Sequence, residues 1–153
     1  MEIIMETKNE IFLNSRYKRH FETLKHISRD LIPCARARIA ACVVYKNEIV
    51  SFGVNRRKSH PLQAKYSRNQ ESIFLHAEIS AINNALRYMN NNLERCNLLI
   101  YRAKIVNGIW CSGLAKPCSG CSRCLVAFGI NQIIYSTETV DKYEIVEDYC
   151  GSI

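Results

Sequence analysis

Four side chains in two short segments have the types and spacing that could assemble a catalytic metal site. His76 and Glu78 flank Ala77 at the start of a segment with helical apolar periodicity, and Cys118 and Cys121 follow about forty residues later. Zinc prefers imidazole and thiolate ligands, and three protein ligands leave the fourth tetrahedral position to water. We therefore predict that His76, Cys118 and Cys121 bind Zn²⁺ in an open arrangement, which is typical of catalytic sites.

Glu78 supplies a carboxylate that this ligand set does not need. Zinc lowers the pKa of a bound water to about 7, and a carboxylate beside that water can accept its proton and pass it on to a substrate. A carboxylate that also ligated the metal would lose this freedom. We therefore assign Glu78 to proton transfer, as the catalytic residue, and not to coordination.

Both cysteines are predicted to lie near the start of one helix, over residues 118–128. Their three-residue spacing places the two sulfurs on the same side of its first turn, where the partial positive charge of the helix lowers thiol pKa values. Cys124 is an alternative fourth ligand that would close the site and make it structural. However, six residues along a helix put Cys124 about 120° around the axis from Cys118, so we predict that it faces the core.

Apolar periodicity predicts the elements that position these residues. Helices are predicted over residues 15–32, 74–90 and 118–128, with Pro33 ending the first and Gly129 ending the third. Strands are predicted over residues 39–45 and 49–54 as a hairpin, over 98–103, and over 130–136. A further hairpin or insertion is expected around residues 108–113, a long loop over 55–72, and a terminal helix after Glu138.

The order of these elements indicates the fold class. Helix, hairpin, helix, strand, helix and strand follow one another, which predicts an α/β layered domain with a central mixed sheet. Ligands in such sheets gather near strand ends and helix N-termini. Because both motifs begin helices, we expect them to meet at one rim of the sheet.

Composition is that of one globular domain. The chain has 153 residues, 48% of them hydrophobic, which predicts a single domain over residues 1–153 with a core of about 15–137. The N-terminal residues are unlike a secretory signal, and no apolar run is long enough to span a membrane. We therefore expect a cytoplasmic protein with reduced thiols. Five scattered cysteines are predicted to be small buried residues, namely Cys34, Cys42, Cys96, Cys111 and Cys150.

Charge is unevenly distributed along the chain. The formal net charge is +7, and residues 1–70 carry fourteen Lys or Arg against six Asp or Glu. A basic half favours a phosphate-bearing partner, either a nucleotide or a polynucleotide. Part of this charge is interpreted as the solvated face of the first helix, which carries Arg16, Lys18, Arg19, Lys25 and Arg29.

Segments 38–44, 53–55, 76–82, 117–121 and 129–135 resemble, in this order, successive elements of the cytidine and deoxycytidylate deaminase superfamily. The resemblance implies a three-layer α/β/α fold, one catalytic zinc, and hydrolytic deamination of a cytosine or adenine ring. It also implies that Glu78 delivers a proton to the ring nitrogen beside the attacked carbon and later protonates the departing ammonia.

The same resemblance suggests which residues contact substrate. It implies that Asn55 contacts the sugar or base, although a turn residue is the other interpretation; Arg56 and Ala77 complete the predicted substrate-binding set. Nucleoside deaminases of this superfamily usually have Cys where this chain has His76, which favours nucleotide or polynucleotide substrates. The deoxycytidylate branch usually has Gly after the Asn and Asn in place of Ser80, whereas Asn55-Arg56 resembles the tRNA adenosine deaminases.

Three functions are therefore compared. The first is deamination of a free pyrimidine nucleotide, foremost dCMP, whose phosphate would be bound by Arg56, Arg57 and Lys58. This hypothesis also includes a homo-oligomer, because oligomers are common in the superfamily.

The second function is deamination of cytosine in single-stranded DNA or of a tRNA base, with the base flipped into the pocket. Lys65, Tyr66 and Arg68 would then form a basic and aromatic track for the flanking nucleotides. The third is a non-catalytic zinc-binding module, which only Cys124 supports.

Overall fold

The computed structural model describes residues 3–11, 13–31, 38–68 and 74–151, with side chains described at 11, 13–31, 38–68 and 74–146. Its elements are β1 (Ile3–Ile11), α1 (Ser15–Arg29), β2 (Arg38–Tyr45), β3 (Glu48–Val54), α2 (Pro61–Tyr66), α3 (Ala77–Leu86), β4 (Cys96–Val106), β5 (Ile109–Gly113), α4 (Ser119–Ala127), β6 (Gln132–Ser136) and β7 (Tyr143–Gly151). All seven strands join one sheet in the order β1-β7-β6-β4-β2-β3, with β5 paired to β4. The β4–β6 pair is parallel and the other described pairs are antiparallel, so the sheet is mixed, as predicted.

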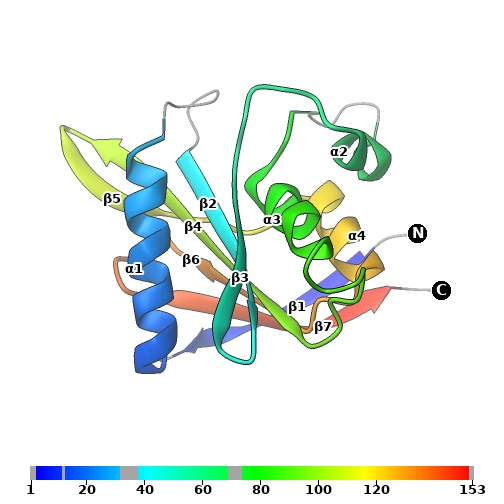
Figure 1. Cartoon of the computed structure of the whole chain (residues 1–153). Helices are drawn as coiled ribbons and strands as arrows, with labels where there is room; N and C mark the ends of the chain where they lie inside the picture. The colour runs from blue at the N-terminus through cyan, green and yellow to red at the C-terminus, as the bar shows by residue number, and fades with distance from the viewer. Residues whose placement is uncertain (1–2, 12, 32–37, 69–73, 152–153) are drawn as a thin grey trace.

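Helices cover both faces of this sheet (Figure 1). In β2, Ala41 and Val43 pack into the core under α3 and α4, whereas Ala40, Cys42 and Val44 pack into the core under α1. A strand that is buried on both faces must be apolar at every position, which explains the continuous apolar run in this part of the sequence. The three-layer α/β/α architecture is therefore confirmed. No helix in the described part of the chain has both the length and the apolarity needed to cross a bilayer.

Most predicted elements are present with shifted ends. Asn14 caps α1 by accepting the Tyr17 N–H at 2.8 Å, and the helix ends at Arg29; the predicted effect of Pro33 lies outside the described residues. The hairpin of β2 and β3 is confirmed, as is the hairpin of β4 and β5. Gly129, with φ +74°, follows the C-terminal turn of α4 as predicted.

The predicted loop over residues 55–72 contains a helix, α2, that the sequence analysis missed. Pro61 occupies its first turn, where proline fits because its missing N–H would have no helical partner. His60 caps the helix, since its Nδ1 accepts the Leu62 N–H at 3.1 Å. Proline was interpreted as a loop residue, although at this position it begins a helix.

The two ends of the chain were also predicted incorrectly. The expected terminal helix is wrong, because residues 143–151 form β7 between β6 and β1. Tyr143 and Ile145 are buried on the α1 side of the sheet, whereas Glu144 between them accepts a hydrogen bond from the Tyr135 hydroxyl at 2.7 Å. This alternation has the period of a strand. No strand was predicted over residues 3–11, where β1 pairs with β7.

The hairpin of β4 and β5 meets the end of β6 at a buried serine. The Ser136 hydroxyl accepts the Arg102 N–H at 3.1 Å and donates to the Gly113 carbonyl at 2.7 Å. The Ser136 carbonyl accepts the Ala115 N–H at 3.0 Å. The segment that leads to Cys118 therefore leaves the sheet from a point that three hydrogen bonds hold in place.

Helix α3 packs directly against the backbone of β3 at Gly53. A Cβ atom at this position would lie 2.2 Å from the Ala81 nitrogen and 2.4 Å from the Ala77 carbonyl oxygen. Backbone atoms cannot rotate away from such a contact, so α3 would have to move. We expect Gly53→Ala to lower the free energy of unfolding by about 3 kcal/mol or more, measured by chemical denaturation.

Gly108→Ala is the matched control for this prediction. Gly108 has φ +76° and no atom within 4 Å of an added Cβ, so that substitution costs only the strain of a left-handed alanine, about 1 kcal/mol. Equal losses of stability in the two variants would contradict the close packing of α3 on β3.

Candidate metal centre

His76 is placed by the junction between a loop and α3. It is the N-cap residue of this helix, with extended backbone angles, and does not lie inside a helix as the predicted range 74–90 implied. The residue before it is held on both sides, because Leu75 accepts the Arg56 N–H and donates its own N–H to Lys58, each at 2.9 Å. The His76 N–H is donated to the Gln63 side-chain oxygen at 3.0 Å. The backbone at this ligand is therefore tied to residues 56–63.

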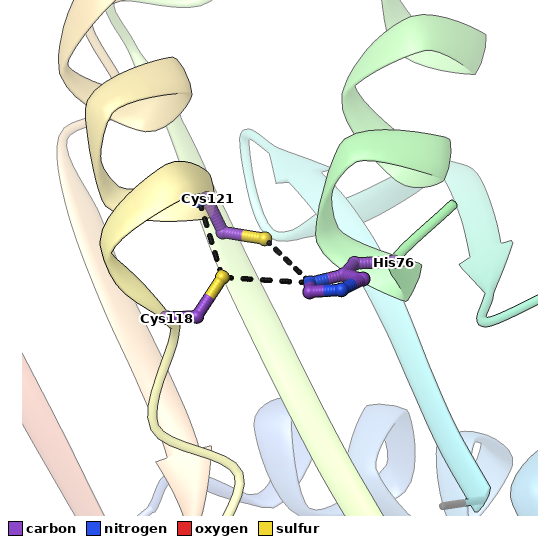
Figure 2. Close-up of side chains that lie close together, drawn as sticks. All are labelled: His76, Cys118 and Cys121. Carbon is purple, nitrogen blue, oxygen red and sulfur yellow. Dashed lines mark hydrogen bonds between the residues drawn. The ribbon is translucent and has the colours of Figure 1, made fainter. Parts of the chain in front are cut away.

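The two cysteines are placed by the first turn of α4. Cys118 is its N-cap residue, and its sulfur accepts the Cys121 N–H at 3.4 Å. Both sulfurs lie on the same side of this turn, facing His76, as their spacing predicted (Figure 2). The N-cap position also puts Cys118 at the positive end of the helix, where a thiolate is favoured.

The imidazole of His76 and the two thiols converge between α3 and α4 (Figure 2). His76 Nδ1 lies 3.3 Å from Cys121 Sγ and 3.5 Å from Cys118 Sγ, and the three ligand atoms all lie within 4.8 Å of one another. Tetrahedral zinc with bonds of about 2.0–2.3 Å requires ligand atoms at such spacings. The donor set fits Zn²⁺, with nitrogen and sulfur as its atoms.

Burial differs among the three ligands. Cys121 is buried and His76 is half-buried, whereas Cys118 is exposed. The group is therefore open to solvent on the side of Cys118 and closed on the side of the core. Such one-sided access suits a site that must admit water and a substrate.

The two facing thiols have pKa values that are shifted in opposite directions. The hydrogen bond with Cys121 is the main cause that lowers the pKa of Cys118 to about 4; burial opposes this shift and His76 supports it. The pKa of Cys121 is raised, chiefly because of the hydrogen bond with Cys118 and then because of burial. Both sulfurs would bind a cation as thiolates, so metal binding releases the protons that the thiols hold.

Glu78 lies in the first turn of α3 and is 5% exposed. Burial raises the pKa of this carboxyl, and the charge of His76 lowers it in part. The neighbouring Cys121 thiol also lowers the pKa of this carboxyl, by a smaller amount, so Glu78 lies near the ligand group. A carboxyl beside a metal site can accept a proton and release it again.

The remaining described cysteines lie outside the ligand group. Cys124 is 0% exposed and belongs to the core under α3 and α4, which confirms the predicted orientation. Cys42 and Cys96 are buried as predicted, whereas Cys111 is half-buried on β5. Cys34 lies outside the described residues, and no side chain is described for Cys150.

The three predicted substrate-binding residues differ in exposure and in hydrogen bonding. The Asn55 side-chain oxygen accepts the Ile39 N–H at 2.9 Å, so part of its amide supports the hairpin of β2 and β3. Arg56 is exposed next to Leu75, and Ala77 is fully buried in the first turn of α3. Their contacts with substrate stay predictions.

Gln63 is the residue near the site that sequence reasoning missed. It lies in α2, within the segment predicted as a loop, and its side chain bonds to the backbone of a metal ligand thirteen residues away. Pro61 was the available signal for the helix. The hydrogen bond itself joins distant residues and has no local signature in the sequence.

Comparison with known proteins places these motifs in context. The family model described as "Cytidine and deoxycytidylate deaminase zinc-binding region" matches residues 14–137. A search of curated proteins gave no match. Among solved structures, the chain resembles the dCMP deaminase of the cyanophage S-TIM5, with 20% identity, a TM-score of 0.55, and coverage of 84% of this chain and 89% of that chain. It also resembles the cytidine deaminase of Burkholderia pseudomallei, with 12% identity, a TM-score of 0.56, and coverage of 84% and 90%.

Proposed function

Because the chain belongs to the cytidine and deoxycytidylate deaminase family, we propose that it catalyses zinc-dependent deamination of a cytosine nucleotide, with dCMP and water converted to dUMP and ammonia. The observation that carries this proposal is the convergence of His76, Cys118 and Cys121 within 4.8 Å, with the buried carboxyl of Glu78 beside them. The proposal includes a single domain over residues 1–153 that acts in a homo-oligomer.

The proposed chemistry divides between the metal and one side chain. When bound, zinc supplies Lewis acidity that activates water at neutral pH. Glu78 takes the proton from that water and delivers it to N3 of the cytosine ring, beside the carbon that is attacked. It then protonates the departing amino group, so one carboxylate acts first as base and then as acid. Its burial favours the first of these transfers, because desolvation disfavours the charged carboxylate and raises its pKa.

A basic segment beside the site supports a phosphate-bearing substrate. Arg56, Arg57 and Lys58 are exposed, and the backbone bonds to Leu75 place them next to the residue that precedes His76. Arginine binds phosphate oxygens through charge-assisted hydrogen bonds. A nucleotide with its base at the metal could therefore reach this segment with its 5′-phosphate.

We expect Arg56→Ala to raise KM for dCMP about tenfold, as the loss of one hydrogen bond to a charged group predicts, and to change KM for deoxycytidine much less. Steady-state kinetics with the two substrates measures this difference. Arg19→Ala is the matched control, because Arg19 is exposed on α1 across the sheet. Equal changes for nucleotide and nucleoside would reject the phosphate contact.

A substrate panel tests the proposed function and its alternatives. The zinc-loaded protein is incubated with dCMP, CMP, cytidine, single-stranded DNA and tRNA, and the deaminated products are quantified. We expect the fastest turnover with dCMP. Turnover of a polynucleotide alone, with affinity that falls steeply as salt is added, would favour the second function. Zinc binding without turnover of any substrate would favour the non-catalytic module.

A further inference from the structure

Helix α2 contacts both parts of the metal centre through polar groups. Gln63, in the middle of this helix, is 0% exposed. Its side-chain oxygen accepts the His76 N–H at 3.0 Å, and its side-chain nitrogen donates to the Ser67 hydroxyl at 3.1 Å. A buried amide is tolerated when its polar atoms are paired, and here one of the partners is the backbone of a metal ligand.

The hydrogen bond between Gln63 and His76 follows directly on the backbone hydrogen bonds that hold Leu75. Arg56 and Lys58 hold both backbone groups of Leu75, and Gln63 continues this pairing by one residue to His76. His76 has extended angles as the N-cap of α3, and its side chain makes no capping bond. The His76 carbonyl accepts the Ser80 N–H at 3.0 Å within the first turn of α3, and Gln63 holds the backbone N–H on the other side of the residue. These two hydrogen bonds together orient the backbone from which the imidazole projects.

The other end of α2 is fastened to the helix that carries the cysteines. Arg123, two residues beyond Cys121, donates from Nε and Nη2 to the Tyr66 carbonyl at 2.9 and 2.6 Å. The Tyr66 ring packs against Phe128 of the same segment, with centroids 6.5 Å apart. Gln63 and Tyr66 are three residues apart, so one short helix links the histidine side of the centre to the cysteine side.

We propose that Gln63 is a positioning residue for the metal centre, which holds the backbone of His76 at the place where its imidazole meets the two cysteine sulfurs. The inference rests on the metal site that the proposed function uses. Three ligands from two separate helices bind one ion tightly only when the helices keep a fixed separation. Residues that orient metal ligands without touching the metal typically contribute a factor of about 10–100 to affinity.

Gln63→Met tests this role, because methionine has a similar length and lacks both hydrogen-bonding groups. We expect the zinc dissociation constant, measured by competition with a chelator, to rise about 10- to 100-fold. We also expect the visible absorption bands of the Co²⁺-loaded protein to shift, since these bands report ligand geometry. Gln63→Glu keeps an oxygen acceptor for the His76 N–H and should return the zinc affinity to within about threefold of the parent.

Ser67→Ala is the matched control, because it removes the hydroxyl to which the Gln63 side-chain nitrogen donates. It should lower thermal stability as Gln63→Met does, while zinc affinity and the Co²⁺ spectrum stay unchanged. Unaltered zinc affinity and spectrum in Gln63→Met would overturn the proposal, as would an equal loss of affinity in Ser67→Ala. If Gln63→Met does not fold, Gln63→Asn withdraws the same amide by one methylene, and unchanged zinc affinity in that variant overturns the proposal equally. Both readouts measure metal binding, so they are independent of whether the parent deaminates dCMP.

Discussion

Glu78→Gln is expected to abolish most turnover while the protein keeps its zinc. Glutamine has nearly the same shape as the buried carboxyl and cannot carry the proton, so the loss should reach the 10²–10⁴-fold that proton transfer typically contributes, about 3–5 kcal/mol. The zinc affinity should change little, because Glu78 is not among the three ligand residues. Initial rates with dCMP and zinc content per chain, measured on one preparation, give both quantities.

Glu78→Asp provides the control for this experiment. It retains a carboxyl that is one methylene shorter, so its turnover should lie between those of the parent and Glu78→Gln. A proton carrier should contribute at least about 100-fold to the rate. If Glu78→Gln kept more than about a tenth of the parent rate, the assigned role would therefore be wrong. Loss of zinc from Glu78→Gln would instead identify Glu78 as a ligand.

Cys118→Ser should weaken metal binding strongly, with little effect on the fold. Cys118 is exposed, and serine is a good N-cap residue that can accept the Cys121 N–H in place of the sulfur. A structural zinc site contributes about 10–16 kcal/mol through four ligands, so the loss of one thiolate predicts a weakening of zinc binding by about 100- to 1000-fold. Turnover measured at limiting zinc should fall in proportion and return in part at high zinc.

Cys124→Ala separates an open site from a closed one. Cys124 packs in the core, so this variant should lose stability but keep one zinc per chain and the parent's metal affinity. A drop in affinity as large as that of Cys118→Ser would mean that Cys124 is a fourth ligand, and the site would then be structural.

The metal ligands could be predicted from sequence because their geometry is local. Cys118 and Cys121 lie within one helical turn of each other, and this spacing alone turns both sulfurs to one side. The histidine motif also stands at the start of a helix, and the α/β order of elements brings two such helix ends to one rim. The orientation of Cys124 followed from the same helical geometry.

The parts that sequence reasoning missed depend on contacts between distant residues. Strand β1 forms because β7 offers it a partner, and nothing within residues 3–11 has a strong strand period. The segment after Glu138 is rich in acidic residues, which obscured the alternation of Tyr143, Glu144 and Ile145. This short alternation indicates a strand only once β6 and β1 are seen to pair with it on both sides. Gln63 looks like one polar residue in a polar segment, and its role depends on His76 lying beside it in the folded chain.

The central claim is that His76, Cys118 and Cys121 hold one zinc with a position left for water. X-ray absorption at the zinc edge of the zinc-loaded protein tests it most directly. The predicted spectrum has two sulfur ligands at about 2.3 Å, one imidazole nitrogen at about 2.0 Å and one further oxygen, which is replaced when a cytosine nucleotide analogue binds. Three or four sulfur ligands, or a coordination sphere unchanged by such an analogue, would contradict the account.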